Sequence, residues 1–251
     1  MANQSFSMPL ALSLGNLCKQ AYSQYETQKK GEAWSVADGY QFLTTLHGVY
    51  EDNAIPIGFM AKKGNDLYVA WRGTDNVEEW IIDIKFEQVN CPFFDESIKL
   101  ELGFSELYGT GHGSTHPSPR DACLEQIKKE KGIETIYVTG HSLGGALAAI
   151  NALDIVTQFN TAPVVYTFAS PRTGNHHFAH CYNERINHSW RIVNSHDEVP
   201  KLPPKSCPPV FHEYHYKHVN NEHIITFGDT WNLPFDHSLT NYLDKLEKLS
   251  A

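Results

Sequence analysis

Residues 136–147 read IYVTGHSLGGAL, and this stretch decides the fold. A β-favouring run, Ile136–Thr139, leads into the pattern G-x-S-x-G at residues 140–144, and a helix rich in alanine and leucine is predicted over Leu143–Phe159. A serine at the tip of such a turn takes a strained backbone conformation, and the glycines keep neighbouring side chains clear of it. The free N–H groups at the start of the helix point toward charge that develops near the serine. This context predicts a nucleophilic Ser142, whereas the five-residue pattern alone would also suit an ordinary glycine-rich helix start.

The elements around this stretch alternate between strand and helix. Strands are predicted at Thr135–Thr139, Pro163–Ala169 and Trp190–Asn194, with a second helix near Asn175–Asn187. This alternation is typical of a parallel sheet with crossover helices, so the fold class is α/β. Further elements are predicted at residues 10–28 (helix), Tyr40–His47, Pro56–Lys63 and Asp66–Trp71 (strands), Glu78–Ile84 and about Arg120–Lys131 (helices), Ser195–Pro209 (irregular loop), Ile224–Phe227 (strand) and Asp236–Leu249 (helix).

The composition of the 251-residue chain is that of a globular protein. Hydrophobic residues make up 41% and charged residues 20%, which argues against a disordered chain or a coiled-coil rod. The net charge is −9 and no basic cluster is present, so the chain is a poor partner for nucleic acid. No apolar run reaches the roughly 20 residues of a transmembrane helix. No repeat or linker divides the sequence, and we predict one domain over residues 1–251.

The amino terminus and the cysteines bear on the compartment. Residues 8–17 (MPLALSLGNL) follow no Lys or Arg and lack a small-x-small cleavage pattern, so we predict a first amphipathic helix rather than a signal peptide. The compartment stays open between the cytoplasm and secretion by a non-classical route. The five cysteines have no CxxC spacing and suit reduced thiols or one incidental disulfide: Cys18, Cys91, Cys123, Cys181 and Cys207.

A serine nucleophile needs a base, and the base needs a carboxylate that orients it. On a strand–elbow–helix scaffold the order along the chain is serine, acid, histidine. Position favours His237, before the last helix, among fourteen histidines, and Asp197, just after the strand that ends at Asn194. Asp236 is adjacent to His237, so the two side chains should diverge, and Asp154 lies too far along the serine's helix. Position alone leaves both assignments open.

Five stretches of the sequence, in this order, carry a family resemblance. They are VAWRGT at 69–74 followed by WIID at 80–83, GF at 103–104 with Tyr108, VTGHSLGGALA at 138–148, TFASPRTGN at 167–175, and RIVN at 191–194 leading to Asp197, with His237, Leu239 and Tyr242 later. Over about residues 66–243 the chain resembles the class 3 lipases, the fungal-type lipase family of α/β-hydrolases.

The resemblance implies an α/β-hydrolase fold, with a mostly parallel central sheet flanked by helices. It assigns the nucleophile to Ser142, the acid to Asp197 and the base to His237, while a histidine such as His218 is common in the family outside the triad. It also implies an oxyanion hole made by the backbone N–H groups of Leu143 and Thr74, to which the Thr74 hydroxyl could add a second donor.

Residues 76–84 hold an apolar stripe at helical spacing, with acidic residues on the other side. Such a stripe is more often core packing than a functional surface. In the family it resembles, this position is that of a lid, a short helix that covers the active site and opens at lipid surfaces. The lid residues would be Val77, Trp80, Ile81 and Ile84.

Two histidine-rich groups could suggest a metal: His176, His177 and His180 with Cys181, and His212, His215, His218 and His223. Neither contains the glutamate of H-E-x-x-H or an obvious carboxylate partner. Ester hydrolysis by a serine needs no metal, so we predict neither a metal site nor a cofactor.

These observations predict a serine carboxylic ester hydrolase, foremost a lipase that cleaves acylglycerols and makes transient contact with a lipid interface. A phospholipase A1 or a feruloyl-type esterase on the same fold is the alternative, because the triad does not fix the acyl or alcohol group. A binding module with a relict triad is the alternative from another class, and three filled triad positions count against it.

Overall fold

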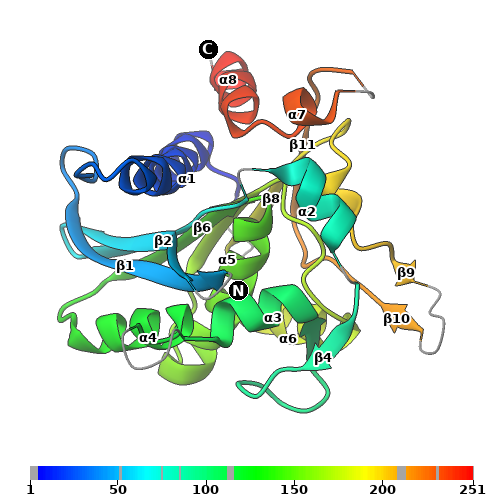
Figure 1. The fold of residues 1–251 in the computed structure, drawn as a ribbon, viewed down its shortest axis with the longest axis horizontal. Helices are drawn as coiled ribbons and strands as arrows, with labels where there is room; N and C mark the ends of the chain where they lie inside the picture. Colours follow the sequence, from blue (N-terminus) through cyan, green and yellow to red (C-terminus); the bar gives the residue numbers. More distant parts are fainter. Residues whose placement is uncertain are drawn as a thin grey trace.

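The protein is described by a computed structural model that covers residues 5–50, 53–74, 76–84, 86–111, 116–207, 213–229 and 232–250. Its centre is a seven-stranded sheet in the order β1-β2-β3-β6-β7-β8-β11 (Figure 1). From β3 to β11 every neighbouring pair is parallel, and β1 and β2 add an antiparallel edge, which confirms the predicted mostly parallel sheet. The strands span Gln41–Tyr50 (β1), Asn53–Lys63 (β2), Asp66–Trp71 (β3), Thr135–His141 (β6), Val164–Phe168 (β7), Ser189–Asn194 (β8) and Glu222–Ile225 (β11).

Helices cover both faces of the sheet (Figure 1). One face carries α1 (Met8–Lys29) and α8 (Leu239–Ser250). The opposite face carries α3 (Leu102–Gly109), α4 (Pro119–Lys129), α5 (Leu143–Phe159) and α6 (His176–Arg185). Short elements complete the described chain: α2 (Val77–Asp83), α7 (Leu233–Asp236), the 3₁₀ turn Val199–Lys201, and the paired strands β4 (Gln88–Asn90) with β5 (Lys99–Glu101) and β9 (Ser206–Cys207) with β10 (Tyr214–His215).

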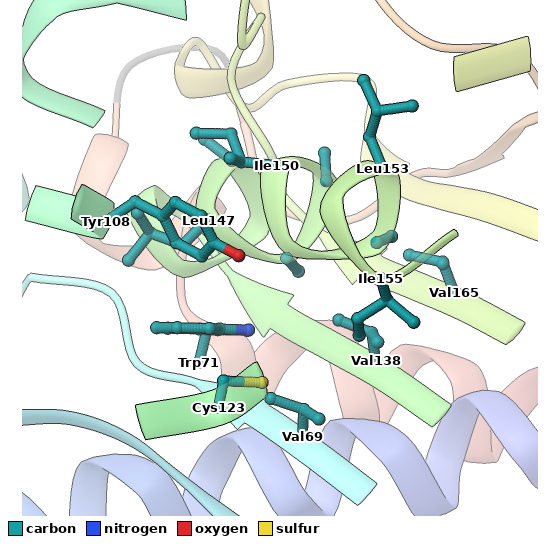
Figure 2. Packing of buried hydrophobic residues seen from close by; sticks show 14 of the residues in the cluster. Val69, Trp71, Tyr108, Cys123, Val138, Leu147, Ile150, Leu153, Ile155 and Val165 are labelled. Carbon is teal, nitrogen blue, oxygen red and sulfur yellow. The ribbon is translucent and has the colours of Figure 1, made fainter. Parts of the chain in front are cut away.

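The two-sided core follows from the strand period of two. In β3, Val69 and Trp71 point into the cluster under α5, whereas Tyr68 and Ala70 point into the cluster under α1 and α8. Figure 2 shows the α5 side, where Trp71 and Val69 of β3 and Val138 of β6 lie beneath the helix. Burial of each such large apolar side chain contributes about 1.5–3 kcal/mol.

Several predicted elements differ from the structure. The C-terminal helix expected over Asp236–Leu249 is α8, which begins later, at Leu239. A separate short helix, α7, ends just before His237, and the Asn232 side chain caps it by accepting from the Phe235 N–H at 3.2 Å. The proline-rich loop Ser195–Pro209 contains a 3₁₀ turn and β9. Helix α3 is not predicted from the sequence, and it begins where the Glu101 carboxylate accepts from the Phe104 N–H at 2.8 Å.

The arrangement gathers the ends of the parallel strands at one edge of the sheet. Trp71 at the end of β3 is in register with Gly140 in β6, and Phe168 at the end of β7 with His141. Ligand sites of open α/β sheets form at this carboxyl edge. Among the described residues, no helix is both long and apolar enough to cross a bilayer.

Candidate active site

Ser142 lies on the turn between β6 and α5, with φ 58° and ψ −130°, a left-handed conformation that a non-glycine residue adopts only under strain. Its N–H donates to the Phe168 carbonyl of β7 at 2.9 Å, which ties the turn to the sheet. A Cβ at Gly140 would lie 2.0 Å from the Gly144 carbonyl oxygen, and one at Gly144 would lie 2.5 Å from the Trp71 carbonyl oxygen. Both glycines are therefore required by the close approach of α5 to the sheet.

Asp197 and His237 meet although 40 residues separate them. Asp197 follows β8 and is fully buried, and His237, between α7 and α8, is 4% exposed. The Nδ1–H of His237 donates to Asp197 Oδ2 at 2.8 Å, while the Val199 N–H donates to Asp197 Oδ1 at 2.9 Å. The ring of His237 therefore has its Nε2 free to face away from the carboxylate.

Ser142 and His237 end in polar atoms that bond to nothing among the described residues. Ser142 Oγ and His237 Nε2 are both buried there without a hydrogen-bond partner. The structure thus forms the acid–base hydrogen bond and not the serine–histidine one. Hydrogen bonds of this kind are often long in free enzymes and tighten when substrate binds.

Tyr242 of α8 supports the same carboxylate. Its hydroxyl donates to Asp197 Oδ2 at 2.8 Å and accepts from the Asn194 N–H at 2.8 Å. Burial, and next the charge of Asp197, raise the pKa of Tyr242 well above its usual value, so the phenol stays a donor. With two donors on Oδ2 and one on Oδ1, the Asp197 carboxylate is held in one orientation.

The other candidate acids and the other candidate base have different partners. Asp154 is buried in the core, where Arg120 Nε and the Tyr108 hydroxyl donate to Oδ2 at 2.6 and 3.0 Å. The backbone carbonyl of Asp236 accepts from Asn194, and Asp236 Oδ1 has no partner among the described residues. His218 Nε2 donates to the Pro200 carbonyl at 2.6 Å.

The two predicted oxyanion donors lie on neighbouring elements, because Thr74 follows β3 and Leu143 begins α5 beside it. The Thr74 hydroxyl accepts from the Asn76 N–H at 3.2 Å and donates to the Asn76 carbonyl at 3.4 Å. In this structure the hydroxyl therefore belongs to the start of α2, and the backbone N–H is the group of Thr74 that could hold an oxyanion.

The predicted lid segment forms the helix α2, capped by the Asn76 side chain, which accepts from the Glu79 N–H at 3.1 Å. Trp80 stacks on buried Phe104 with ring centroids 6.1 Å apart and 17° between planes, and Ile84 also packs against the core. Val77 and Ile81 are half-buried, while Ile82 is 81% exposed. α2 therefore rests on the body of the protein through an apolar face.

His141 and Tyr22 are contacts of the site that sequence reasoning missed. His141 Nε2 donates to the His237 carbonyl at 2.9 Å, and the Tyr22 hydroxyl donates to His141 Nδ1 at 2.8 Å. The sequence does hold a signal for His141, because it directly precedes Ser142 within the motif. Tyr22 carries no local signal, because it reaches the site across 119 residues of sequence.

The histidine-rich groups do not converge. Among the described residues, no three His, Cys, Asp or Glu side chains are placed to hold a metal ion. His180 lies 3.4 Å from Glu184 on the surface of α6, and His223 stacks on Phe6. His212, a member of the second group, lies outside the described residues.

Known proteins that resemble this chain point to one family. A family model described as Lipase (class 3) matches residues 68–207. The Arabidopsis thaliana protein "Phospholipase A1-Igamma3, chloroplastic" is 38% identical over 160 residues, 55% of this chain. A lipase of Rhizomucor miehei is 30% identical over 185 residues, 71% of this chain. The chain covers only 30% and 46% of the length of these two proteins.

Solved structures resemble the whole arrangement. A triacylglyceride lipase of Rhizomucor miehei superposes with a TM-score of 0.67 at 26% identity, and covers 88% of this chain and 82% of its own. A triacylglycerol lipase whose catalytic centre is a serine protease triad gives a TM-score of 0.69 at 25% identity over 90% of this chain and 82% of its own. The structural resemblance thus covers more of the chain than the residues that the family model matches.

Proposed function

This chain belongs to the class 3 lipase family, with the α/β-hydrolase fold that the sequence predicts, and from this we propose that it is a serine hydrolase cleaving carboxylic esters of acylglycerols. The observation that carries the proposal is the buried His237–Asp197 hydrogen bond of 2.8 Å, together with a serine at positive φ on the turn between β6 and α5. The similarity to lipases supports the substrate class.

The proposed mechanism assigns one role to each of the five site residues. Ser142 Oγ attacks the ester carbonyl while His237 Nε2 takes its proton, and Asp197 stabilises the resulting imidazolium. The N–H groups of Leu143 and Thr74 hold the oxyanion. The tetrahedral intermediate then expels the alcohol, which receives the proton from His237. Water, deprotonated by His237, cleaves the acyl-enzyme in the same way and restores Ser142.

We propose that α2 is the lid of this site. Its apolar face packs on Phe104 through Trp80, and its N-cap Asn76 is hydrogen bonded to Thr74, the proposed oxyanion residue. Movement of α2 would uncover the apolar face and would free the Thr74 hydroxyl from Asn76. We propose that a lipid surface binds the apolar face that this movement uncovers.

Phospholipid is the second candidate substrate, because a phospholipase A1 is 38% identical over 55% of the chain. The triad chemistry is the same for both esters, and only the recognised alcohol group differs.

Rates on a substrate panel, for the wild type and Ser142→Ala, test the proposal. The panel contains p-nitrophenyl butyrate, emulsified triacylglycerol, phosphatidylcholine and methyl ferulate. Ser142→Ala should lower the preferred rate by about 10⁴-fold or more and leave the melting temperature nearly unchanged. Activity of the variant within about tenfold of wild type would remove Ser142 from the mechanism. A wild type without activity on any ester would favour a relict triad.

A further inference from the structure

The residue before the nucleophile connects the N-terminal helix to the base. Tyr22 of α1 lies before the matched residues 68–207, yet its hydroxyl is 2.8 Å from His141 Nδ1. On the other side of the ring, His141 Nε2 is 2.9 Å from the backbone carbonyl of His237, and the rings of His141 and His237 are 4.7 Å apart between centroids. A continuous polar chain therefore runs from α1 to the loop that holds the base.

The geometry fixes which ring nitrogen of His141 carries the proton. The His237 carbonyl oxygen can only accept, so Nε2 of His141 must be protonated. Nδ1 then has a lone pair, and the Tyr22 O–H donates to it. Burial, and next the charge that His237 can carry, hold the pKa of His141 well below its usual value, which keeps the ring neutral. In the other tautomer, the Nε2 lone pair would face the His237 carbonyl and repel it.

Tyr22 also lies against the oxyanion loop. A Cβ at Gly73 would lie 2.2 Å from the Tyr22 hydroxyl oxygen and 2.7 Å from the His141 carbonyl oxygen. Only a residue without a side chain leaves room for the hydroxyl there. The same hydroxyl thus packs against the residue before Thr74 while it bonds to His141.

We propose that Tyr22 and His141 are positioning residues, which hold the loop of the base His237 and the oxyanion loop at Gly73-Thr74 in one arrangement. Neither side chain takes part in bond making. The His237 carbonyl sets the tautomer of His141, Tyr22 donates to Nδ1 of that tautomer and packs beside the oxyanion loop, and His141 fixes the backbone of His237. The kinetic part of this inference rests on the proposed function, and the tautomer does not.

Nitrogen NMR of histidine-labelled protein tests the tautomer independently of activity, with His141 assigned by its absence in His141→Gln. The wild type should show His141 as the neutral Nε2–H form near pH 7, and Tyr22→Phe should keep that form but shift the Nδ1 resonance, because Nδ1 loses its hydrogen-bond donor. An Nδ1–H form in the wild type, or a spectrum unchanged by Tyr22→Phe, would overturn the inference. If the wild type hydrolyses no ester, the proposed function falls and this measurement still decides the inference.

Kinetics on a soluble ester test the consequence. Tyr22→Phe should lower kcat by about tenfold with KM within about twofold, the size expected for one hydrogen bond that acts in the transition state. His141→Leu should lose at least as much, and His141→Gln, whose amide can still donate to the His237 carbonyl, should recover most of the loss. In the His141→Leu background, Tyr22→Phe should add less than about twofold, because the two residues act in series.

Tyr25→Phe is the matched control, since it deletes a hydroxyl one turn further along α1 and keeps the ring that stacks on the Arg72 guanidinium at 3.9 Å. It should leave kcat and KM unchanged. Equal losses in Tyr22→Phe and Tyr25→Phe, or losses at Tyr22 and His141 that simply multiply, would contradict the positioning chain.

Discussion

The hydrogen bonds to the Asp197 carboxylate determine how the base His237 is oriented. Three donors reach it, from His237, Tyr242 and the Val199 backbone, and none of its surface is exposed. An ion so buried is stable only when its hydrogen bonds are complete. Asp197→Asn, which replaces one carboxylate oxygen by an NH2 group, therefore disturbs the base and leaves the backbone in place.

Asp197→Asn should lower kcat on a soluble ester by up to about 10⁴-fold, because the amide favours the wrong tautomer of His237. KM should change little, since no substrate contact is removed. Steady-state kinetics with a melting curve of the same preparation checks this. A variant that keeps a tenth of wild-type kcat would show that Asp197 does not orient the base.

Two histidines can be compared directly as bases. His237→Ala should be as inactive as Asp197→Asn, because it removes the proposed general base. His218→Ala removes a side chain that bonds to the Pro200 carbonyl, so it should keep kcat and lose only stability. Rates and melting temperatures of both variants provide the measurement, and an active His237→Ala beside an inactive His218→Ala would reverse the assignment.

Functional residues can be predicted from the sequence where a residue type suited to the chemistry lies within a recognisable motif. Ser142 follows from the elbow pattern, and Asp197 and His237 follow from chain order and family resemblance; the fold then brings these last two within hydrogen-bonding distance. Tyr22 and His141 were not found, because their roles arise from a contact between α1 and the end of β6. A tyrosine in an amphipathic helix carries no sign of such a contact.

Helix α2 has the properties of an element that can leave the body of the protein. It has seven residues, its N-cap is Asn76, which is hydrogen bonded to Thr74, and its outward face combines exposed Ile82 with Glu78 and Glu79. A helix this short has little intrinsic stability, so its position depends on the packing of Trp80 and Ile84.

Trp80→Ser separates a lid from core packing. Burial of Trp80 contributes about 1.5–3 kcal/mol, enough to move a two-state equilibrium from mostly closed to mostly open at a lipid surface. Wild-type activity on a long-chain ester should rise more steeply above its solubility limit than below it, and Trp80→Ser should flatten that rise while short-chain hydrolysis stays nearly intact. Ile82→Ser, at a fully outward position, controls for effects of substitution on melting temperature. A uniform loss of both activities with a lower melting temperature would show that Trp80 is core.

Elements are predictable where one periodic pattern spans them. The bounds of α5 and β3 agree with prediction, because each is an uninterrupted run with clear ends. α3 was missed because its sequence, LGFSELYG, begins and ends near glycine and depends on the Glu101 cap. The break between α7 and α8 could not be read from the pattern either, since it is held by the bond of the His237 carbonyl to His141.

The buried histidines make the stability of the folded protein depend on pH. Burial lowers the pKa of His141 and of His218 well below the usual value, so both stay neutral in the folded state. In the unfolded chain they bind protons below about pH 6.5. Unfolding therefore takes up protons in acid, and the stability present above pH 6.5 is lost as the pH falls toward the folded-state pKa.

Melting temperature should consequently fall between pH 7 and pH 5, with up to about 1.4 kcal/mol of unfolding free energy lost per pH unit for His141. His141→Gln should be less sensitive to pH over this interval, even if it is less stable at pH 7. Parallel slopes for the two proteins would remove His141 as a cause. One domain over residues 1–251 stays a prediction, and the same curves test it, because one domain should melt in a single cooperative transition.

Covalent labelling of the nucleophile tests the central claim most directly. A fluorophosphonate reacts with a serine only when a base and an oxyanion hole activate it. Mass spectrometry of the treated wild type should find one equivalent of adduct, on the peptide that contains Ser142, and none on Ser142→Ala or His237→Ala. An adduct on another residue, or ester hydrolysis by a wild type whose Ser142 stays unlabelled, would contradict the proposed active site.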